Sequence, residues 1–405
     1  MIIRDEGIKN KERFENMAPF TVEEAKKAMD FVVFKAREGL SEFTDKFPAA
    51  ASKNLIYSAT ENIGWTTGFW TGILWLCYQY TGDEEFKKAA ELQCKSFKKR
   101  IEEHYAVDHH DMGFLYSPSC VEGYKLTLDK DMKDAAIMAA DNLISRYHEK
   151  GEFIQAWGPL DEAESYRLII DCMNNIPLLF WASEVTGDDK YREIAIKHAN
   201  TSANNVIRED SSTYHTFYFD INTGAPLKGV THQGHRNDSA WSRGQAWGIY
   251  GSALSYRFLK DTYYLDVFRK LCTFFLTHLP QDLVPYWDFD FDDGSTEPRD
   301  SSAAAIAACG MLEMARHLEG EEKAYYEGMA ARLLKALCQH CAVQEKDQSN
   351  GLLLHGTYAR ASAENPCSDR GVDECNTWGD YYYMEALTRV CSDWRAYWDY
   401  WEKDE

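Results

Sequence analysis

A short motif recurs where one predicted helix ends and the next begins. Residues 80–89 read Tyr-Thr-Gly-Asp-Glu-Glu-Phe-Lys-Lys-Ala, and residues 185–194 repeat the pattern as Val-Thr-Gly-Asp-Asp-Lys-Tyr-Arg-Glu-Ile. Looser copies begin at positions 128, 259, 318 and 390. In each copy an apolar helix runs into a Gly- or Asp-containing turn, and a charged amphipathic segment follows. These junctions predict a repeated helical architecture with a unit of roughly 45–75 residues.

The two helices of each predicted pair differ in character. The first is apolar or small on nearly all sides, whereas the second carries a charged face, so the first is expected inside and the second at the surface. The apolar examples cover residues 69–80, 176–186, 244–259 and 303–318. We expect an all-α fold, an (α/α)6 barrel or toroid of six inner/outer helical hairpins, in which residues 22–43 form the outer partner of the last inner helix. A linear helical solenoid is the alternative.

The composition limits the kinds of partner. Lys and Arg number 44 and Asp and Glu number 65, which gives a net charge of −21. Nucleic-acid binding and attraction to anionic membrane surfaces both need a basic surface, so neither is expected. The first eleven residues lack the apolar core of a signal peptide, and no apolar run is long enough to span a membrane.

Eleven cysteines follow no disulfide spacing, which predicts reduced thiols and a cytoplasmic location. Cys338 and Cys341 are expected to be buried side chains rather than a metal site. No Pro-, Gly- or Ser-rich linker divides the chain, so residues 1–405 are predicted to form a single domain.

The segments that enter the predicted inner helices carry the unusual residues. In a toroid of this kind they surround the mouth of a central cavity, where a rigid scaffold presents loop residues. They are rich in Trp, His, Asp, Arg and Gln. Trp75 and Trp181 fall inside apolar helices and are expected to pack in the core. Other tryptophans lie beside glycines and polar residues, where an indole face can hold a sugar ring or pack in the core: Trp65, Trp157, Trp247 and Trp378.

Two of the many acids have apolar or aromatic neighbours near the start of an inner helix. Asp111 precedes Met-Gly-Phe-Leu-Tyr, and Asp171 lies between Leu-Ile-Ile and Cys-Met-Asn-Asn-Ile-Pro. Helix capping and loop hydrogen bonding are the simple interpretations. The functional interpretation is a carboxyl pair facing one cavity, in which desolvation and a neighbouring carboxylate raise one pKa and keep that group protonated.

Two apparent metal motifs fail on inspection. Residues 288–294 resemble a calcium loop, but the glycine is one position late and Arg299 replaces the bidentate glutamate. Residues 108–111 read Asp-His-His-Asp, but adjacent side chains are expected to diverge. The densest polar stretch, residues 231–247, supplies Gln233 and Arg243, with His215 upstream. Arg243 is expected either to be buried against an acid or to face an anionic ligand.

At these residues the chain resembles the unsaturated glucuronyl hydrolases, glycoside hydrolase family 88. The similarity runs from Gly-Trp-Thr-Thr-Gly-Phe-Trp at residues 64–70 to Trp-Gly-Asp-Tyr-Tyr-Tyr at residues 378–383. It includes the segments around Asp111 and Asp171 and the Trp-Ser-Arg-Gly-Gln-Ala-Trp of residues 241–247.

The resemblance implies an (α/α)6 barrel that removes the terminal Δ4,5-unsaturated glucuronic acid from lyase-generated glycosaminoglycan oligosaccharides. The reaction begins by hydrating the C4=C5 vinyl ether and needs no metal or organic cofactor. Asp171 is implied as the general acid and base, and Asp111 as the neighbour that tunes its proton affinity. Other residues are implied to surround the sugar, with Arg243 expected at its carboxylate: Trp65, Trp157, His215, Gln233, Arg243 and Trp247.

One segment departs from the family pattern. Some relatives bind a substrate sulfate through a serine and lysine motif, whereas this chain reads Arg-Ala-Ser-Ala-Glu-Asn-Pro-Cys-Ser-Asp-Arg at residues 360–370. Ser368 and Arg370 are the expected substitutes, and chondroitin, hyaluronan and heparin fragments all remain open. An unsaturated rhamnogalacturonyl hydrolase acting on pectin fragments is the nearest alternative. A sugar epimerase with a histidine pair and a non-catalytic carbohydrate-binding protein are further ones.

Overall fold

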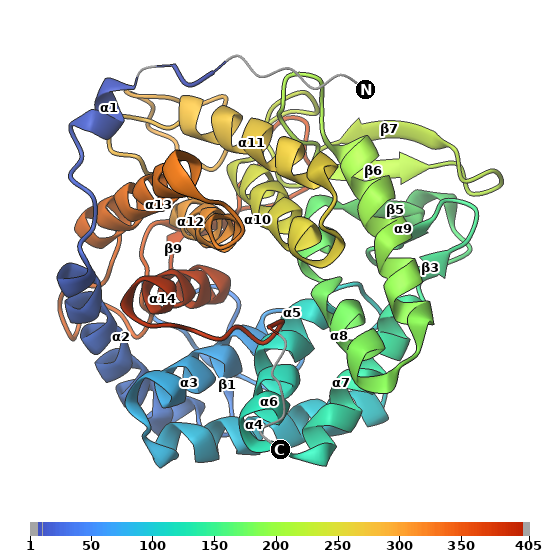
Figure 1. Ribbon diagram of the computed structural model, residues 1–405, viewed down its shortest axis with the longest axis horizontal. Coiled ribbons are helices and arrows are strands. Elements are labelled where there is room, and N and C mark those ends of the chain that lie inside the picture. The colour runs from blue at the N-terminus through green and yellow to red at the C-terminus, as the bar shows by residue number, and fades with distance from the viewer. Residues whose placement is uncertain (1–6, 10, 400–405) are drawn as a thin grey trace.

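The computed structural model describes residues 7–9 and 11–399. The expectation that no signal peptide is present rests largely on residues 1–6 and 10, which lie outside the described part. Figure 1 shows the helices standing around a common axis. Among the described residues no helix is long and apolar enough to cross a membrane.

The inner helices are buried on nearly all sides. They are α3 (Thr67–Thr81), α8 (Pro177–Thr186), α10 (Ser242–Leu259), α12 (Ser301–Ala315) and α14 (Thr377–Cys391). In α10 every residue from Ser242 to Ser255 is buried. Pro177 opens α8, where its missing N–H is not needed by the helix. The predicted inner helices are therefore confirmed to within three residues at each end.

The outer helices expose one charged face and pack in pairs on the inner ones. They are α2 (Val22–Phe43), α4 (Glu84–Glu102), α7 (Lys130–Ile144), α9 (Asp189–Val206), α11 (Thr262–Thr277) and α13 (Gly320–His340). Helix α3 contacts α4, α8 contacts α9, α10 contacts α11, and α12 contacts α13. Helix α2 lies against α14, as predicted, although nearly the whole chain separates them.

The capping chemistry explains the junction motif. Gly82 and Gly187 end α3 and α8 in the left-handed conformation, each with a φ of 71°. Asp83 and Asp188 then accept a hydrogen bond from the second N–H of the next helix. A glycine stops one helix and an aspartate starts its partner, so the chain reverses in a few residues. The junction at position 390 differs, because no outer helix follows α14 in the described chain.

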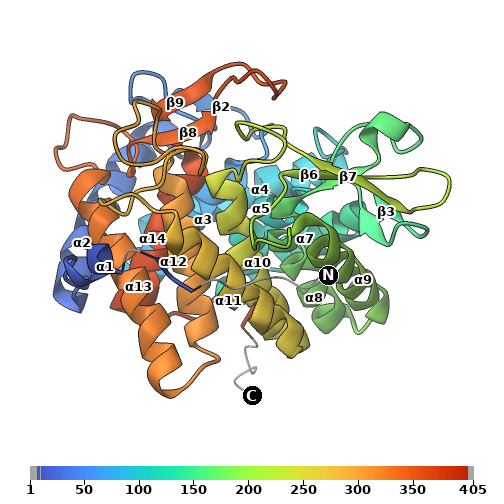
Figure 2. The same cartoon turned by 90° about the horizontal axis from the view of Figure 1, so that it is seen from above.

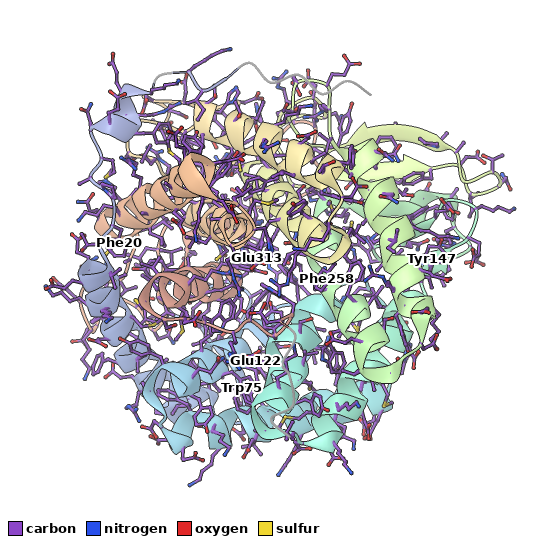
Figure 3. The ribbon with its side chains drawn as sticks, viewed as in Figure 1. Phe20, Trp75, Glu122, Tyr147, Phe258 and Glu313 are labelled. Carbon is purple, nitrogen blue, oxygen red and sulfur yellow. The ribbon has the colours of Figure 1, made fainter. Side chains whose placement is uncertain are left out.

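The second inner unit is broken rather than continuous. It consists of α5 (Met112–Tyr116), the π-helical turn η1 (Ser117–Val121) and α6 (Glu122–Thr127). Trp75 of α3 donates its indole N–H to the carbonyl of Ser119 at 3.0 Å, so it packs in the core as expected (Figure 3). Trp181 is also buried, against Tyr124.

Small antiparallel sheets correct the all-α expectation. They pair β1 (Phe47–Pro48) with β2 (Ala59–Thr60), β3 (Tyr147–His148) with β4 (Phe153–Ile154), and β8 (Gly356–Ala359) with β9 (Arg370–Glu374). The largest joins β5 (Arg167–Ile169), β6 (Thr216–Phe219) and β7 (Pro226–Val230). Figure 2 shows the labelled strands at one end of the helical ring. The long segments entering the inner helices satisfy their backbone groups by pairing.

A buried ionic network lies toward the carboxyl ends of the inner helices. Glu313 of α12 is fully buried and accepts hydrogen bonds from Arg257 at 3.0 Å and Arg389 at 2.9 Å (Figure 3). Glu385 and Asp399 pair with the same arginines. Because each charge has an opposite partner, the desolvation cost of burying them is offset.

Candidate active site

One cavity of about 240 Å³ lies at the amino ends of the inner helices. Eight residues predicted for the site line it, and five further residues complete the wall. The predicted ones are Trp65, Asp111, Trp157, Asp171, His215, Gln233, Arg243 and Trp247, and the others are His110, Ile169, His232, Trp241 and Tyr358.

Helix starts deliver the wall residues. Asp111 immediately precedes α5, Arg243 lies in the first turn of α10, and Asp171 lies in the 3₁₀ turn η3 (Ile170–Asn174) ahead of α8. The amino end of a helix carries a partial positive charge, and of these three elements only α10 is long enough to have an appreciable dipole. The positive end of α10 and the charge of Arg243 lie at the cavity and partly offset the charge of the acids in its wall.

The two acids face each other across a tight packing contact. A Cβ atom on Gly113 would lie 2.4 Å from the Cα of Asn175, so only glycine permits this approach. The side-chain oxygen of Asn175 also accepts a hydrogen bond from the N–H of Phe114 at 2.8 Å. These contacts join the start of α5, next to Asp111, to the end of η3, next to Asp171.

The loop hydrogen bond expected as the simple interpretation of Asp111 is present, because its Oδ2 lies 2.9 Å from Nδ1 of His109. The capping interpretation of Asp171 is not supported. The side chain of Asp111 makes no cap hydrogen bond to α5, and α8 begins after Ile176 rather than after Asp171. Both side chains are mostly buried, with exposures of 13% and 17%, yet both reach the cavity. Oδ1 of Asp171 has no hydrogen-bond partner among the described residues.

The surroundings of Asp111 and Asp171 shift their pKa values in opposite directions. Burial, followed by the charge of Asp111, raises the pKa of Asp171 well above its usual value. Burial also acts to raise the pKa of Asp111, but His110, the hydrogen bond from His109 and Arg100 together bring it below its usual value. The two environments therefore shift the pKa values of the pair in opposite directions, so that Asp171 keeps a proton to higher pH than Asp111 does.

His110 stands between the two acids. Its Nε2 lies 3.5 Å from a carboxyl oxygen of each. The expectation that adjacent side chains diverge is wrong here, because ligand atoms of His110, Asp111 and Asp171 lie within 4.8 Å of one another. This trio has the donor set of a small metal site.

Aromatic rings form one wall of the cavity. Trp65 stacks on Trp378 with ring centroids 5.2 Å apart, and its indole N–H donates to the hydroxyl of Tyr358 at 2.9 Å. Trp378 itself is fully buried and bonded to Ser302, so its expected place at the mouth is corrected to a core position behind Trp65. Trp247 packs on Phe114, with centroids 5.1 Å apart.

Neutral imidazoles line the opposite side. Burial lowers the pKa of His215 well below its usual value, and the charge of Arg243 acts in the same direction. Its Nδ1 lies 2.7 Å from the hydroxyl of Thr216. The pKa of His232 is lowered by burial and then by the charge of Arg167. Both rings can therefore take part in neutral hydrogen bonds near pH 7.

Arg243 lines the cavity, but its terminal nitrogens already have partners within the chain. The guanidinium forms an ion pair with the buried Asp300 and donates to the carbonyls of Thr357 and Tyr358, each at 2.7 Å. Of the two interpretations of the sequence, the arginine buried against an acid describes these contacts. The pairing also ties α10 and α12 to β8.

Ser368 and Arg370 are not among the residues that line this cavity, and their predicted role at the substrate stays a prediction. Both are exposed. Arg370 opens β9, and its guanidinium lies 4.3 Å from the centroid of the Tyr358 ring. Arg370 therefore packs on a residue of the cavity wall.

Sequence reasoning missed several wall residues. His232 and Trp241 lie inside the polar stretch already singled out, so their type and position could have nominated them. Tyr358 and the buried partner Asp300 carry no local signal, because a strand pairing and a long-range ion pair place them. His110 was visible only as part of a rejected metal motif.

Comparison with known proteins places this geometry in context. The family model described as Glycosyl Hydrolase Family 88 matches residues 40–394. The chain belongs to this family. An unsaturated chondroitin disaccharide hydrolase from Streptococcus pyogenes serotype M1 is 48% identical over 395 residues, covering 97% of this chain and 98% of the relative.

Solved structures of family 88 relatives agree with the fold. The unsaturated glucuronyl hydrolase of Streptococcus agalactiae superposes with a TM-score of 0.94 at 47% identity, covering 98% of this chain and 99% of the other. A mutant of the same enzyme complexed with dGlcA-GalNAc6S gives a TM-score of 0.87 at 44% identity, with the same coverage.

Proposed function

We propose that the protein is an unsaturated glucuronyl hydrolase that removes the terminal Δ4,5-unsaturated glucuronic acid from lyase-generated chondroitin-type oligosaccharides. The observation that carries this proposal is the pair Asp111 and Asp171, which share one cavity and whose pKa values are shifted in opposite directions. A protonated acid beside a carboxylate suits the donation of a proton to a vinyl-ether carbon.

Asp171 is assigned as the general acid and base. Its proton goes to C4, positive charge develops at C5, and the carboxylate of Asp111 stabilises that charge. A water molecule then adds at C5 and returns a proton to Asp171. The resulting hemiketal opens, and the glycosidic bond is lost. No carboxylate attacks the anomeric carbon, so the distance rule for retaining and inverting glycosidases does not apply.

The remaining wall residues are assigned to substrate binding. Trp65, Trp157 and Trp247 offer apolar surfaces to the sugar rings, and His215 and Gln233 offer hydrogen bonds. The positive amino end of α10 favours the uronate carboxylate. Arg243 contributes its charge and holds Tyr358 in place, since its terminal nitrogens are bonded within the chain.

Chondroitin-type fragments are preferred over pectin fragments as the substrate class. The supporting observations are the high identity to a chondroitin disaccharide hydrolase over nearly the whole chain and the similarity to an enzyme complexed with dGlcA-GalNAc6S. The inner/outer helix pairs support an (α/α)6 toroid formed as a single domain. The eleven unpaired cysteines support a cytoplasmic location.

An absorbance assay tests the function. The vinyl ether absorbs in the ultraviolet, and hydration removes that absorbance. Purified protein is incubated with unsaturated chondroitin disaccharides, unsaturated rhamnogalacturonan disaccharide and unsaturated heparin disaccharide. We expect the fastest loss of absorbance on the chondroitin substrates. Faster turnover of the pectin fragment, or binding without loss of absorbance, would overturn the proposal.

A further inference from the structure

One wall of the cavity continues outward as a sheet face that carries two cations. Ile169 of β5 lines the cavity. Side chains two apart on a strand share a face, so Arg167 points the same way and lies about 7 Å farther along the strand. Arg167 pairs in register with Tyr218, and Tyr218 pairs with Lys228. These three side chains therefore form one row across β5, β6 and β7.

Contacts within this row order the side chains. The guanidinium of Arg167 lies 4.7 Å from the ring centroid of the wall residue Trp157 and 5.6 Å from that of Tyr218. The ammonium of Lys228 lies 5.8 Å from the Tyr218 ring on the other side. Aromatic rings and cations thus alternate outward from the cavity wall, in the order Trp157, Arg167, Tyr218 and Lys228.

Both cations retain capacity for a ligand. Arg167 donates through Nη1 to the carbonyl of Glu164 and to the hydroxyl of Tyr218 at 3.1 Å. Its Nε and Nη2 have no hydrogen bond to any described residue, and neither Arg167 nor Lys228 has a carboxylate within 4.0 Å in the described chain. Both cations are therefore available to pair with an anionic group of a ligand.

The charge of Arg167 is felt inside the cavity, because it contributes, after burial, to the lowered pKa of His232. The exposed acids Asp161, Glu162 and Glu164 on the preceding loop make the rim less positive. Recognition at the row therefore depends on direct contact rather than on a long-range field.

We propose that Arg167 and Lys228, ordered by Trp157 and Tyr218, form an outer subsite for an anionic group on the leaving part of the saccharide. The group is a sulfate ester on the adjacent sugar or the carboxylate of the next uronate. The sulfate is a tetrahedral oxyanion and the carboxylate a planar one, and Arg binds either through charged hydrogen bonds. This inference rests on the proposed function. It assigns recognition of this anionic group to the sheet β5–β6–β7, whereas Arg370 lies in the sheet β8–β9.

The test compares three substrates of the full-length protein: an unsulfated unsaturated chondroitin disaccharide, its sulfated counterpart, and an unsulfated unsaturated tetrasaccharide. For Arg167→Gln we expect KM to rise about tenfold for substrates that carry the recognised anion. The value of kcat, and KM for the unsulfated disaccharide, should change by less than about twofold. A rise confined to the sulfated disaccharide identifies the sulfate, and one confined to the tetrasaccharide identifies the uronate. Lys228→Gln should give a weaker effect with the same selectivity.

Two further variants separate charge from structure. Tyr218→Phe removes the hydrogen bond to Arg167 but leaves the cation, so the preference should persist. Arg192→Gln removes a positive charge on α9, where the guanidinium lies over Phe180, and should change nothing. Equal losses on all three substrates with Arg167→Gln, or no loss on any, would overturn the subsite. Turnover by the unaltered protein tests the proposed function separately.

Discussion

Nε2 of His110 lies 3.5 Å from Oδ1 of Asp171. The same nitrogen lies 3.5 Å from Oδ1 of Asp111, so one buried imidazole stands between the two acids. Burial lowers the pKa of His110 to about 4, which leaves the ring neutral near pH 7. A neutral ring has one N–H to donate, so the ring and the acids share a limited number of protons.

Replacing Asp171 with Asn should abolish turnover. The amide keeps the shape of the side chain but has no proton to give to C4, so kcat should fall by about 10³-fold or more, while ligand affinity stays within about tenfold. The absorbance assay gives kcat, and calorimetry with unsaturated disaccharide gives affinity. Asp134→Asn, on the exposed face of α7, serves as the control. Wild-type activity in the Asp171 variant contradicts its role.

Replacing Asp111 with Asn should move the pH profile. Loss of its charge lowers the pKa of Asp171, which is raised first by burial and then by Asp111. The active form needs Asp171 protonated, so the alkaline limb should shift to lower pH. The acid limb, which reports protonation of Asp111, should disappear. The profile of kcat/KM from pH 4 to 9 measures both changes. An unchanged alkaline limb excludes coupling of the acids.

Replacing Gly113 with Ala should impair catalysis by moving α5 relative to η3. The added methyl group would meet the backbone of Asn175 at 2.4 Å, so Asp111 and Asp171 must separate. We expect a loss of stability of about 1–3 kcal/mol and a fall in kcat of about 10²-fold. Gly328→Ala is the matched control, because its nearest neighbour is a flexible arginine tip at 3.2 Å. If both variants behave alike, the contact does not position the acids.

Replacing Glu313 with Gln should destabilise the fold and spare the chemistry. It leaves the network of Arg257, Arg316 and Arg389 one carboxylate short, at a cost of about 3–5 kcal/mol. Burial opposes ionisation of Glu313, but Arg389 and other cations hold its pKa well below the usual value. Its contribution is therefore present above pH about 4.3 and lost as pH falls.

Thermal unfolding at pH 7 and pH 4 measures this effect. The gap between Glu313→Gln and the unaltered protein should narrow at the lower pH, and Glu193→Gln on the exposed face of α9 provides the control. A constant gap would show that the ionised form of Glu313 does not stabilise the protein.

The sequence predicted the helices well because capping is local. Gly82 and Asp83 lie next to each other, and their conformational preferences need no distant partner. The acid pair was also accessible, since apolar neighbours marked both members. The distance of Ser368 and Arg370 from the cavity was not predictable from the sequence, because it depends on the pairing of β8 with β9. The state of Arg243 was ambiguous until Asp300 was located beside it.

The sheets and the ionic network occupy opposite ends of the inner helices. The end that meets substrate is built from short paired strands and turns, and the end that seals the ring is built from matched charges such as Glu313 and Arg389. Selection can therefore reshape the strands β5–β7 and β8–β9 for a new saccharide while the sealed end keeps the frame rigid. Related enzymes can therefore acquire a new substrate specificity through changes in these strands while the helical framework stays the same.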